Sequence, residues 1–124
     1  MKIRIKGNSI RLRLTRTEVE YFGRTGVLEE KTEFGDNAFS YSLVADGSYM
    51  QMHAELSGAS VIIYMPSSMA KEWVESNTVG YSHDMDLAGN RKLYLLIEKD
   101  FKCLDNTIED QSDNYPNPLA AANE

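Results

Sequence analysis

The chain has 124 residues, a formal net charge of −6 and one cysteine. This length is enough for a single domain with its own hydrophobic core, and a lone cysteine excludes an internal disulfide. No apolar run approaches the length of a membrane span, and the first residues alternate in charge instead of forming a signal peptide, so we expect a cytoplasmic protein.

Charge is distributed unevenly along the chain. Residues 1–31 carry eight basic and four acidic side chains, whereas residues 100–124 carry one basic and six acidic side chains. The overall negative charge argues against a dedicated nucleic-acid-binding protein, but the basic N-terminal part is still suited to binding an anion.

The N-terminal segment predicts a β-hairpin. Residues 2–6 and 10–14 alternate apolar and basic side chains on either side of the turn residues Gly7 and Asn8. Because successive side chains of a strand point to opposite faces, this hairpin should have one apolar face and one basic face.

A short helix should follow the hairpin. Thr15 and Glu18 have the spacing of a helix capping box, which predicts a helix over residues 16–22 that Gly23 and Gly26 stop. After Pro66, which suits the first turn of a helix, an apolar stripe predicts a second helix. That second helix covers residues 67–75.

Alternation and turn residues predict six further strands. Their ranges are 27–34, 38–45, 49–56, 60–65, 78–84 and 92–98. The acidic residues beyond Asp100 show neither a strand nor a helix period, so we expect a tail there, docked by apolar residues. These docking residues are Phe101, Leu104, Ile108 and Tyr115.

The same pattern of apolar residues occurs twice. Residues 7–22 match residues 58–73 without a gap, with Gly7 on Gly58 and Ser9 on Ser60. Since few of the matched residues are identical, the repeat is mainly one of burial, and it predicts architecture rather than activity.

The expected fold is therefore mainly β with two short helices, in the α+β class, built from a duplicated strand-strand-helix-strand-strand unit. Residues 1–99 should form one globular domain of two similar halves, 1–46 and 49–99. Residues 100–124 should form the acidic tail.

Each half resembles the swapped-hairpin unit of the AbrB/MazE-type transition-state regulators and antitoxins. The resemblance rests on residues 6–14 and the capped helix after them, and on residues 60–70, which are similar to that family's strand-to-helix segment. In that family two short chains interleave their strands into one DNA-binding barrel, so the resemblance implies a single-chain swapped-hairpin β-barrel and a regulatory function. The second half departs from the first at the positions of the basic residues. These positions hold His53, Glu55, Ser57, Ile62 and Tyr64.

The whole chain also resembles a family of small uncharacterised bacterial proteins. This resemblance includes residues 109–118 of the expected tail. It implies no activity.

The candidate functional site is the basic face of the first hairpin and the start of the first helix. Six cations occur here without an intervening acid: Lys2, Arg4, Lys6, Arg11, Arg13 and Arg16. Such a surface attracts phosphates and carboxylates, which makes nucleic acid or an acidic protein the expected partner. The alternative is an ordinary solvated face, or one neutralised by Glu29, Glu30 and Glu33 or by the tail.

Other candidate sites have weaker sequence support. Ile62 and Tyr64 place apolar side chains on an outward strand face, which a docked tail, a homodimer partner or a ligand would cover. The acidic residues of the tail lack the pattern of a calcium loop. No pair of Cys or His residues has zinc-site spacing, and neither His53, His83 nor Cys103 has a catalytic partner, so we expect no metal and no cofactor.

Two functions follow from these patterns. The first is a non-enzymatic binding or regulatory module whose basic hairpin engages an anionic partner. The alternative is a phosphate-handling enzyme in which the same cations line a barrel lumen and Glu29, Glu30 or Glu33 hold a divalent metal. The two differ in whether the cations face outward or inward.

Overall fold

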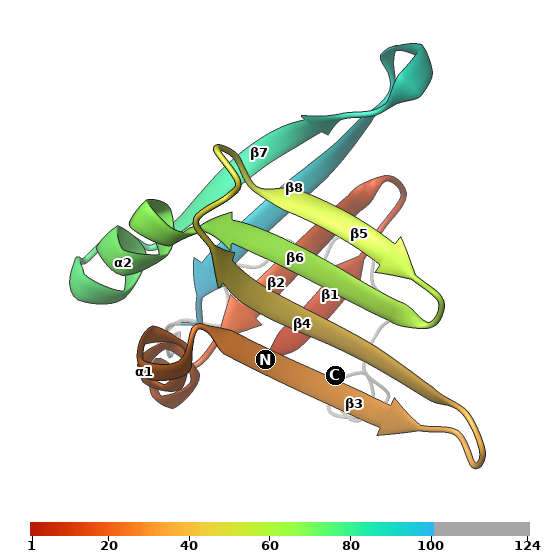
Figure 1. Ribbon diagram of the computed structural model, residues 1–124, viewed down its shortest axis with the longest axis horizontal. Coiled ribbons are helices and arrows are strands. Elements are labelled where there is room, and N and C mark those ends of the chain that lie inside the picture. The colour runs from red at the N-terminus through yellow and green to blue at the C-terminus, as the bar shows by residue number, and fades with distance from the viewer. Residues whose placement is uncertain (101–124) are drawn as a thin grey trace, which may run out of the picture.

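The computed structural model describes residues 1–100, which form a mainly β fold with eight strands and two α-helices (Figure 1). In chain order the elements are β1 Lys2–Ile5, β2 Ser9–Leu14, α1 Arg16–Thr25, β3 Val27–Glu33, β4 Ala38–Asp46, β5 His53–Ser57, β6 Ser60–Pro66, α2 Ser67–Glu75, β7 Gly80–Asp86, the 3-10 turn η1 Ala88–Asn90 and β8 Lys92–Lys99. The predicted mainly β class with two short helices is confirmed.

The strands form two four-stranded sheets. One has the order β1-β2-β8-β7 and the other the order β3-β4-β6-β5, so each combines a hairpin from the first half of the chain with a hairpin from the second. Within each sheet the two hairpins meet through a parallel pair, β2 with β8 and β4 with β6, while the other neighbours are antiparallel. The fold therefore depends on pairings between segments far apart in sequence.

The predicted closed barrel is wrong. A barrel needs every strand to be hydrogen-bonded on both sides. Within residues 1–100, β1 and β7 remain the edges of one sheet, and β3 and β5 remain the edges of the other. The sheets instead pack face to face, with the β3-β4-β6-β5 sheet in front in Figure 1.

The hydrophobic core lies between the two sheets. Alternation along the strands sends every second side chain into it. The largest fully buried residues are Leu12, Leu14, Phe22, Leu43, Met52, Ile63, Met65, Trp73, Leu95 and Ile97. Both helices lie at one end of the sheets, on the left in Figure 1, and their rings Phe22 and Trp73 pack edge to face with centroids 6.1 Å apart.

Helix α1 begins as predicted but ends later. The Thr15 side chain accepts from the Glu18 backbone N–H and the Glu18 carboxylate accepts from the Thr15 N–H, which confirms the capping box. The prediction that Gly23 stops the helix is wrong, because the helix runs to Thr25 and Gly26 caps it with a φ of +75°. Gly23 serves close helix packing, since a Cβ atom there would lie 2.7 Å from Val74 Cγ1 of α2.

The predicted strand over residues 49–56 begins too early. Asp46 Oδ1 accepts hydrogen bonds from the Ser48 N–H at 2.9 Å and from the Ser48 hydroxyl at 2.7 Å, which closes a turn. β5 starts only at His53.

The described chain ends beside the first hairpin. The Asp100 N–H donates to the Leu14 carbonyl over 2.7 Å. The expected tail after it, with its docking residues and Cys103, lies outside the described residues. Among the helices of residues 1–100, none has the length and apolar character to cross a membrane.

Candidate anion-binding face

The β1–β2 hairpin carries its cations on the side that faces away from the other sheet. The strand register pairs Lys2 with Arg13 and Arg4 with Arg11, so these side chains form two adjacent rows. The alternate positions of β2, such as Leu12, are buried in the core. We call the outward set the cationic face. It consists of Lys2, Arg4, Lys6, Arg11 and Arg13.

Glu98 of β8 fixes two of these arginines. The parallel pairing of β2 with β8 places Glu98 directly beside Arg13. Glu98 Oε1 accepts from Arg11 Nε at 2.6 Å and from Arg13 Nη2 at 2.9 Å, and the Glu98 side chain is largely buried. One carboxylate therefore holds two guanidinium groups in place while neutralising only one positive charge.

Sequence reasoning did not identify Glu98. The alternative to an anion-binding face named Glu29, Glu30 and Glu33 as acids that could neutralise it; within residues 1–100 the acid that pairs with Arg11 and Arg13 is Glu98, and Glu30 lies beside the Met1 α-amine. No local pattern points to Glu98, because a parallel pair joins strands through a long connection and its register is set by the whole fold.

Arg4 and Lys6 are the uncompensated cations of the face. Within residues 1–100 neither forms an ion pair. Together with Arg11 they line a shallow cavity of about 200 Å³, whose other lining residues include Ser9 and Tyr94. The Tyr94 side chain contributes an exposed ring to this cavity. The cavity therefore offers three cations, a hydroxyl and an aromatic surface to a bound molecule.

The remaining predicted cations are Lys2, at one end of this face, and Arg16. Lys2 Nζ lies 3.6 Å from Asp100 Oδ2 and stays largely exposed. Arg16 is the first residue of α1, not part of the hairpin, and pairs with Glu20 one turn further along the helix at 3.5 Å. The structure thus brings together the five hairpin cations and leaves Arg16 on a separate element.

The N-terminus anchors β1, the strand that carries Lys2 and Arg4. The Met1 α-amine contacts the Glu18 carboxylate and lies 3.1 Å from Glu30 Oε1, and the Tyr41 hydroxyl donates to the Met1 carbonyl over 2.7 Å. Burial lowers the pKa of the α-amine, but the two carboxylates outweigh it, so its pKa is raised above 8.0.

The pKa of the Glu18 carboxyl is lowered. Burial raises it, but hydrogen bonds from the α-amine and from Thr15 outweigh burial and hold it below 4.5. The α-amine and Glu18 are therefore both charged at neutral pH, and their pairing ties β1 to α1.

A second candidate surface lies on the outer side of the other sheet. Tyr49, from the connection between β4 and β5, stacks on Tyr64 with centroids 4.7 Å apart and on His53 with centroids 5.0 Å apart. Tyr64, predicted to need cover, is thus partly covered within its own chain, while Ile62 beside it is half-buried. A homodimer through this face remains a prediction.

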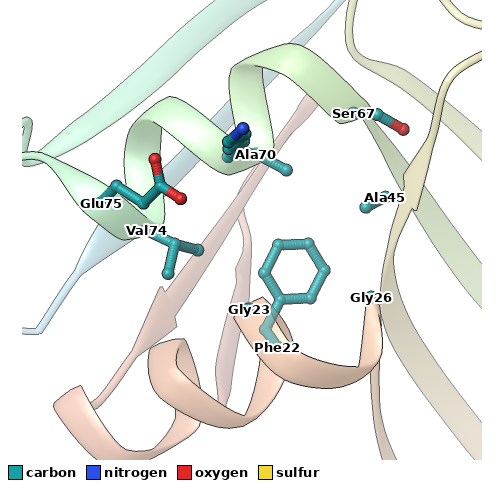
Figure 2. Close-up of a pocket in the computed structure, with 9 residues that line it drawn as sticks. Phe22, Gly23, Gly26, Ala45, Ser67, Ala70, Val74 and Glu75 are labelled. Carbon is teal, nitrogen blue, oxygen red and sulfur yellow. The ribbon is translucent and has the colours of Figure 1, made fainter.

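A cavity of about 350 Å³ separates parts of α1 and α2 (Figure 2). Small residues line much of it: Gly23, Gly26, Ala45, Ser67 and Ala70. Figure 2 shows the Phe22 ring and Val74 facing each other across this space. The cavity is mostly apolar, and the charged residues that line it are Lys71 and Glu75 of α2.

The described residues contain no metal-binding cluster. No three His, Cys, Asp or Glu residues of this part of the chain converge. His53 Nε2 lies 3.4 Å from Glu55 Oε1 on the outer side of the sheet. The enzyme alternative also requires cations inside a barrel, and the hairpin cations instead lie on an outer surface.

Comparison with known proteins gives a family without an assigned activity. A model of the family of unknown function DUF7009 matches residues 1–119. No curated protein and no solved structure matches the chain significantly. The predicted membership of an uncharacterised family is confirmed, and the match extends beyond β8 into the acidic segment.

Proposed function

Because the chain belongs to the DUF7009 family, whose function is unknown, we propose a function from the cationic face itself: this protein is a non-enzymatic binding module that holds an anionic macromolecule. The observation that carries the proposal is the pair Arg4 and Lys6. They line the shallow cavity together with Arg11 and have no ion-pair partner in the described part of the chain.

Preorganisation supports this proposal. Arg11 and Arg13 are both fixed by Glu98, so binding an anion costs these two side chains little conformational freedom. Phosphates and carboxylates can each accept two parallel hydrogen bonds from one guanidinium group. Nucleic acid and acidic protein are therefore the partner classes that the face suits.

The enzyme alternative is not favoured. It needs Lys2, Arg4 and Arg11 to surround an enclosed lumen, whereas the core between the sheets is apolar. It also needs Glu29, Glu30 and Glu33 to act as metal ligands near those cations, and Glu30 is instead engaged by the Met1 α-amine.

We also infer that the two halves are copies of one AbrB/MazE-like unit. The support is the order of elements, strand-strand-helix-strand-strand, which occurs twice, and the exchange of one hairpin from each half into each sheet. The second copy has Ile62 and Tyr64 where the first has Arg11 and Arg13, so anion binding should be confined to the first hairpin. The outer face of the second sheet, which carries His53, Tyr64 and Ile62 and which we call the aromatic face, would instead form the contact of a homodimer.

Heparin chromatography at neutral pH tests the proposal. The variant Arg4→Gln plus Lys6→Gln removes two exposed cations without leaving a buried acid unpaired, and should elute from heparin at lower salt than the wild type. The matched control, Arg24→Gln plus Lys31→Gln, changes net charge equally on other elements and should elute with the wild type. Equal shifts for the two variants, or no retention of any of them, would contradict the proposal.

The partner class is resolved by two probes. A labelled oligonucleotide of mixed sequence and a labelled polyglutamate chain are titrated separately against the wild type and the Arg4→Gln plus Lys6→Gln variant. Binding of the oligonucleotide alone, weakened in the variant, assigns nucleic acid. Binding of polyglutamate alone, weakened in the same way, assigns an acidic protein.

A further inference from the structure

The acidic segment after β8 has an opposite charge to the cationic face. Residues 101–124 carry one basic and five acidic side chains: Lys102, and Asp105, Glu109, Asp110, Asp113 and Glu124. The cationic face carries five basic side chains, of which only Arg11 and Arg13 share an acid from within their sheet. The chain therefore contains both a basic surface and an anionic segment of similar charge.

The described chain ends where this face begins. Asp100 bonds through its N–H to the Leu14 carbonyl and lies 3.6 Å from Lys2 Nζ through its carboxylate. The acidic segment is thus tethered at the Lys2 end of the face, next to the first cation. Intramolecular tethering gives a short segment an effective concentration in the millimolar range at a neighbouring site.

The lengths are compatible with contact along the whole face. From Lys2 to Lys6 an extended strand covers about 14 Å. The five residues from Asp100 to Asp105 can span about 17 Å when extended. The carboxylates of residues 105–113 can therefore reach every cation of the hairpin without any change in the described fold.

We propose that the acidic segment 105–113 occupies the cationic face in cis and competes with external anions for it. This inference rests on the proposed anion-binding function and gives that function a regulator built into the chain. An external anion binds only after it displaces the segment, so its affinity is reduced. A partner that captures the acidic segment would expose the face. The family model includes this stretch, because it extends to residue 119.

Charge neutralisation of the segment in the full chain tests the competition. The tail variant combines Asp105→Asn, Glu109→Gln, Asp110→Asn and Asp113→Asn. The control variant changes net charge equally through exposed acids elsewhere, Glu29→Gln, Glu33→Gln, Asp36→Asn and Glu75→Gln. Binding of a labelled heparin oligosaccharide is measured at about 0.15 M salt, where charges more than about 8 Å apart are largely screened.

The tail variant should bind heparin about tenfold more tightly than the wild type, as expected for release from a tethered competitor at millimolar effective concentration. The control variant should stay near the wild-type affinity. Equal gains in both variants would mean that only net charge matters and would overturn the inference. Unchanged affinity in the tail variant would overturn it too, while leaving the proposed function intact if the Arg4→Gln plus Lys6→Gln variant binds more weakly.

Cross-linking tests occupancy without any ligand. A carbodiimide joins a lysine to a carboxylate in contact with it, and the pair Lys2 and Asp100 provides an internal reference. In the monomer band, Lys2 or Lys6 should cross-link to residues 105–113, and Lys31 and Lys71 should not. Cross-links of the segment to Lys31 and Lys71 only, or none beside the reference pair, would contradict the inference. Cross-links to Lys2 or Lys6 without heparin binding by any variant would support occupancy and reject the proposed function.

Discussion

Arg11 and Glu98 are 87 residues apart in the sequence, yet Arg11 Nε lies 2.6 Å from Glu98 Oε1. The contact exists because β2 and β8 pair in parallel, which joins the second and the last strands of the described chain. Arg13 shares the same carboxylate oxygen. Glu98 therefore restrains both Arg11 and Arg13 and lowers the net charge of the cationic face by one.

Replacing Glu98 by Gln should strengthen anion binding. The amide is nearly isosteric but removes the one negative charge that Arg11 and Arg13 share, so heparin elution should shift to higher salt. The free energy of unfolding should fall by about 1 kcal/mol, since a partly buried ion pair is lost. Glu29→Gln is the control for net charge. Earlier elution of Glu98→Gln would mean that fixing the arginines matters more than their charge.

The contacts of the Met1 α-amine with Glu18 and Glu30, which we call the Met1 anchor, should make the free energy of unfolding depend on pH in both acid and base. The raised pKa of the α-amine contributes stability that is complete below 8.0 and is lost as pH rises through the folded-state pKa. The lowered pKa of Glu18 contributes stability that is complete above 4.5 and is lost as pH falls through the folded-state pKa. The anchor is therefore strongest between these two values.

Glu18→Gln isolates this effect because Gln preserves the capping box with Thr15. Urea unfolding near pH 7 should show a loss of about 1.5–3 kcal/mol, the usual contribution of a hydrogen bond to a charged group. The difference from the wild type should shrink in strong acid and in strong base. Glu20→Gln on the same helix is the control and should change little. A difference that is constant across pH would disprove the electrostatic origin of the anchor.

Gly23→Ala should destabilise the protein although alanine favours helices. The added Cβ atom meets Val74 Cγ1 at 2.7 Å, so either the Val74 side chain must leave its rotamer or α1 and α2 must separate, at a cost of about 1–3 kcal/mol. Combining it with Val74→Ala removes the clash, so the double variant should lose less free energy of unfolding than the two single variants added together. Additive losses would mean that the helices do not meet at this pair.

Tyr49→Ala should uncover the aromatic face of the second sheet. Removing the ring that stacks on Tyr64 and His53 should cost about 1 kcal/mol of stability.

If Tyr64 and Ile62 form a homodimer face, sedimentation velocity should detect a dimer in the wild type that Ile62→Lys abolishes. A monomer at every concentration would contradict the dimer.

Local patterns predicted the hairpins and the helix start well. The alternation over residues 2–14 and the capping box of Thr15 with Glu18 depend on neighbours in sequence, and the structure contains both. The partner of Arg11 and Arg13 could not be predicted in this way, because the parallel register of β2 and β8 is set by packing of the whole core. The prediction of a closed barrel was wrong for the same reason, because no local sequence pattern shows whether the edge strands of two sheets pair with each other.

Gly23 shows a second reason why a local sequence pattern did not predict the structure. A glycine after an amphipathic stretch often ends a helix, but here it sits where a second helix approaches, and only the position of Val74 reveals this. Similarly, no pattern indicates that Glu18 and Glu30 share the Met1 α-amine, which depends on how α1 and β3 sit against β1.

The most direct measurement is the salt dependence of heparin affinity for the full chain and its Arg4→Gln plus Lys6→Gln variant. The wild type should lose affinity steeply as salt rises, and the variant should bind more weakly with a shallower slope, because two cations no longer displace counterions. Superimposable curves for the two proteins would contradict the account, since anions would then bind elsewhere than on the first hairpin.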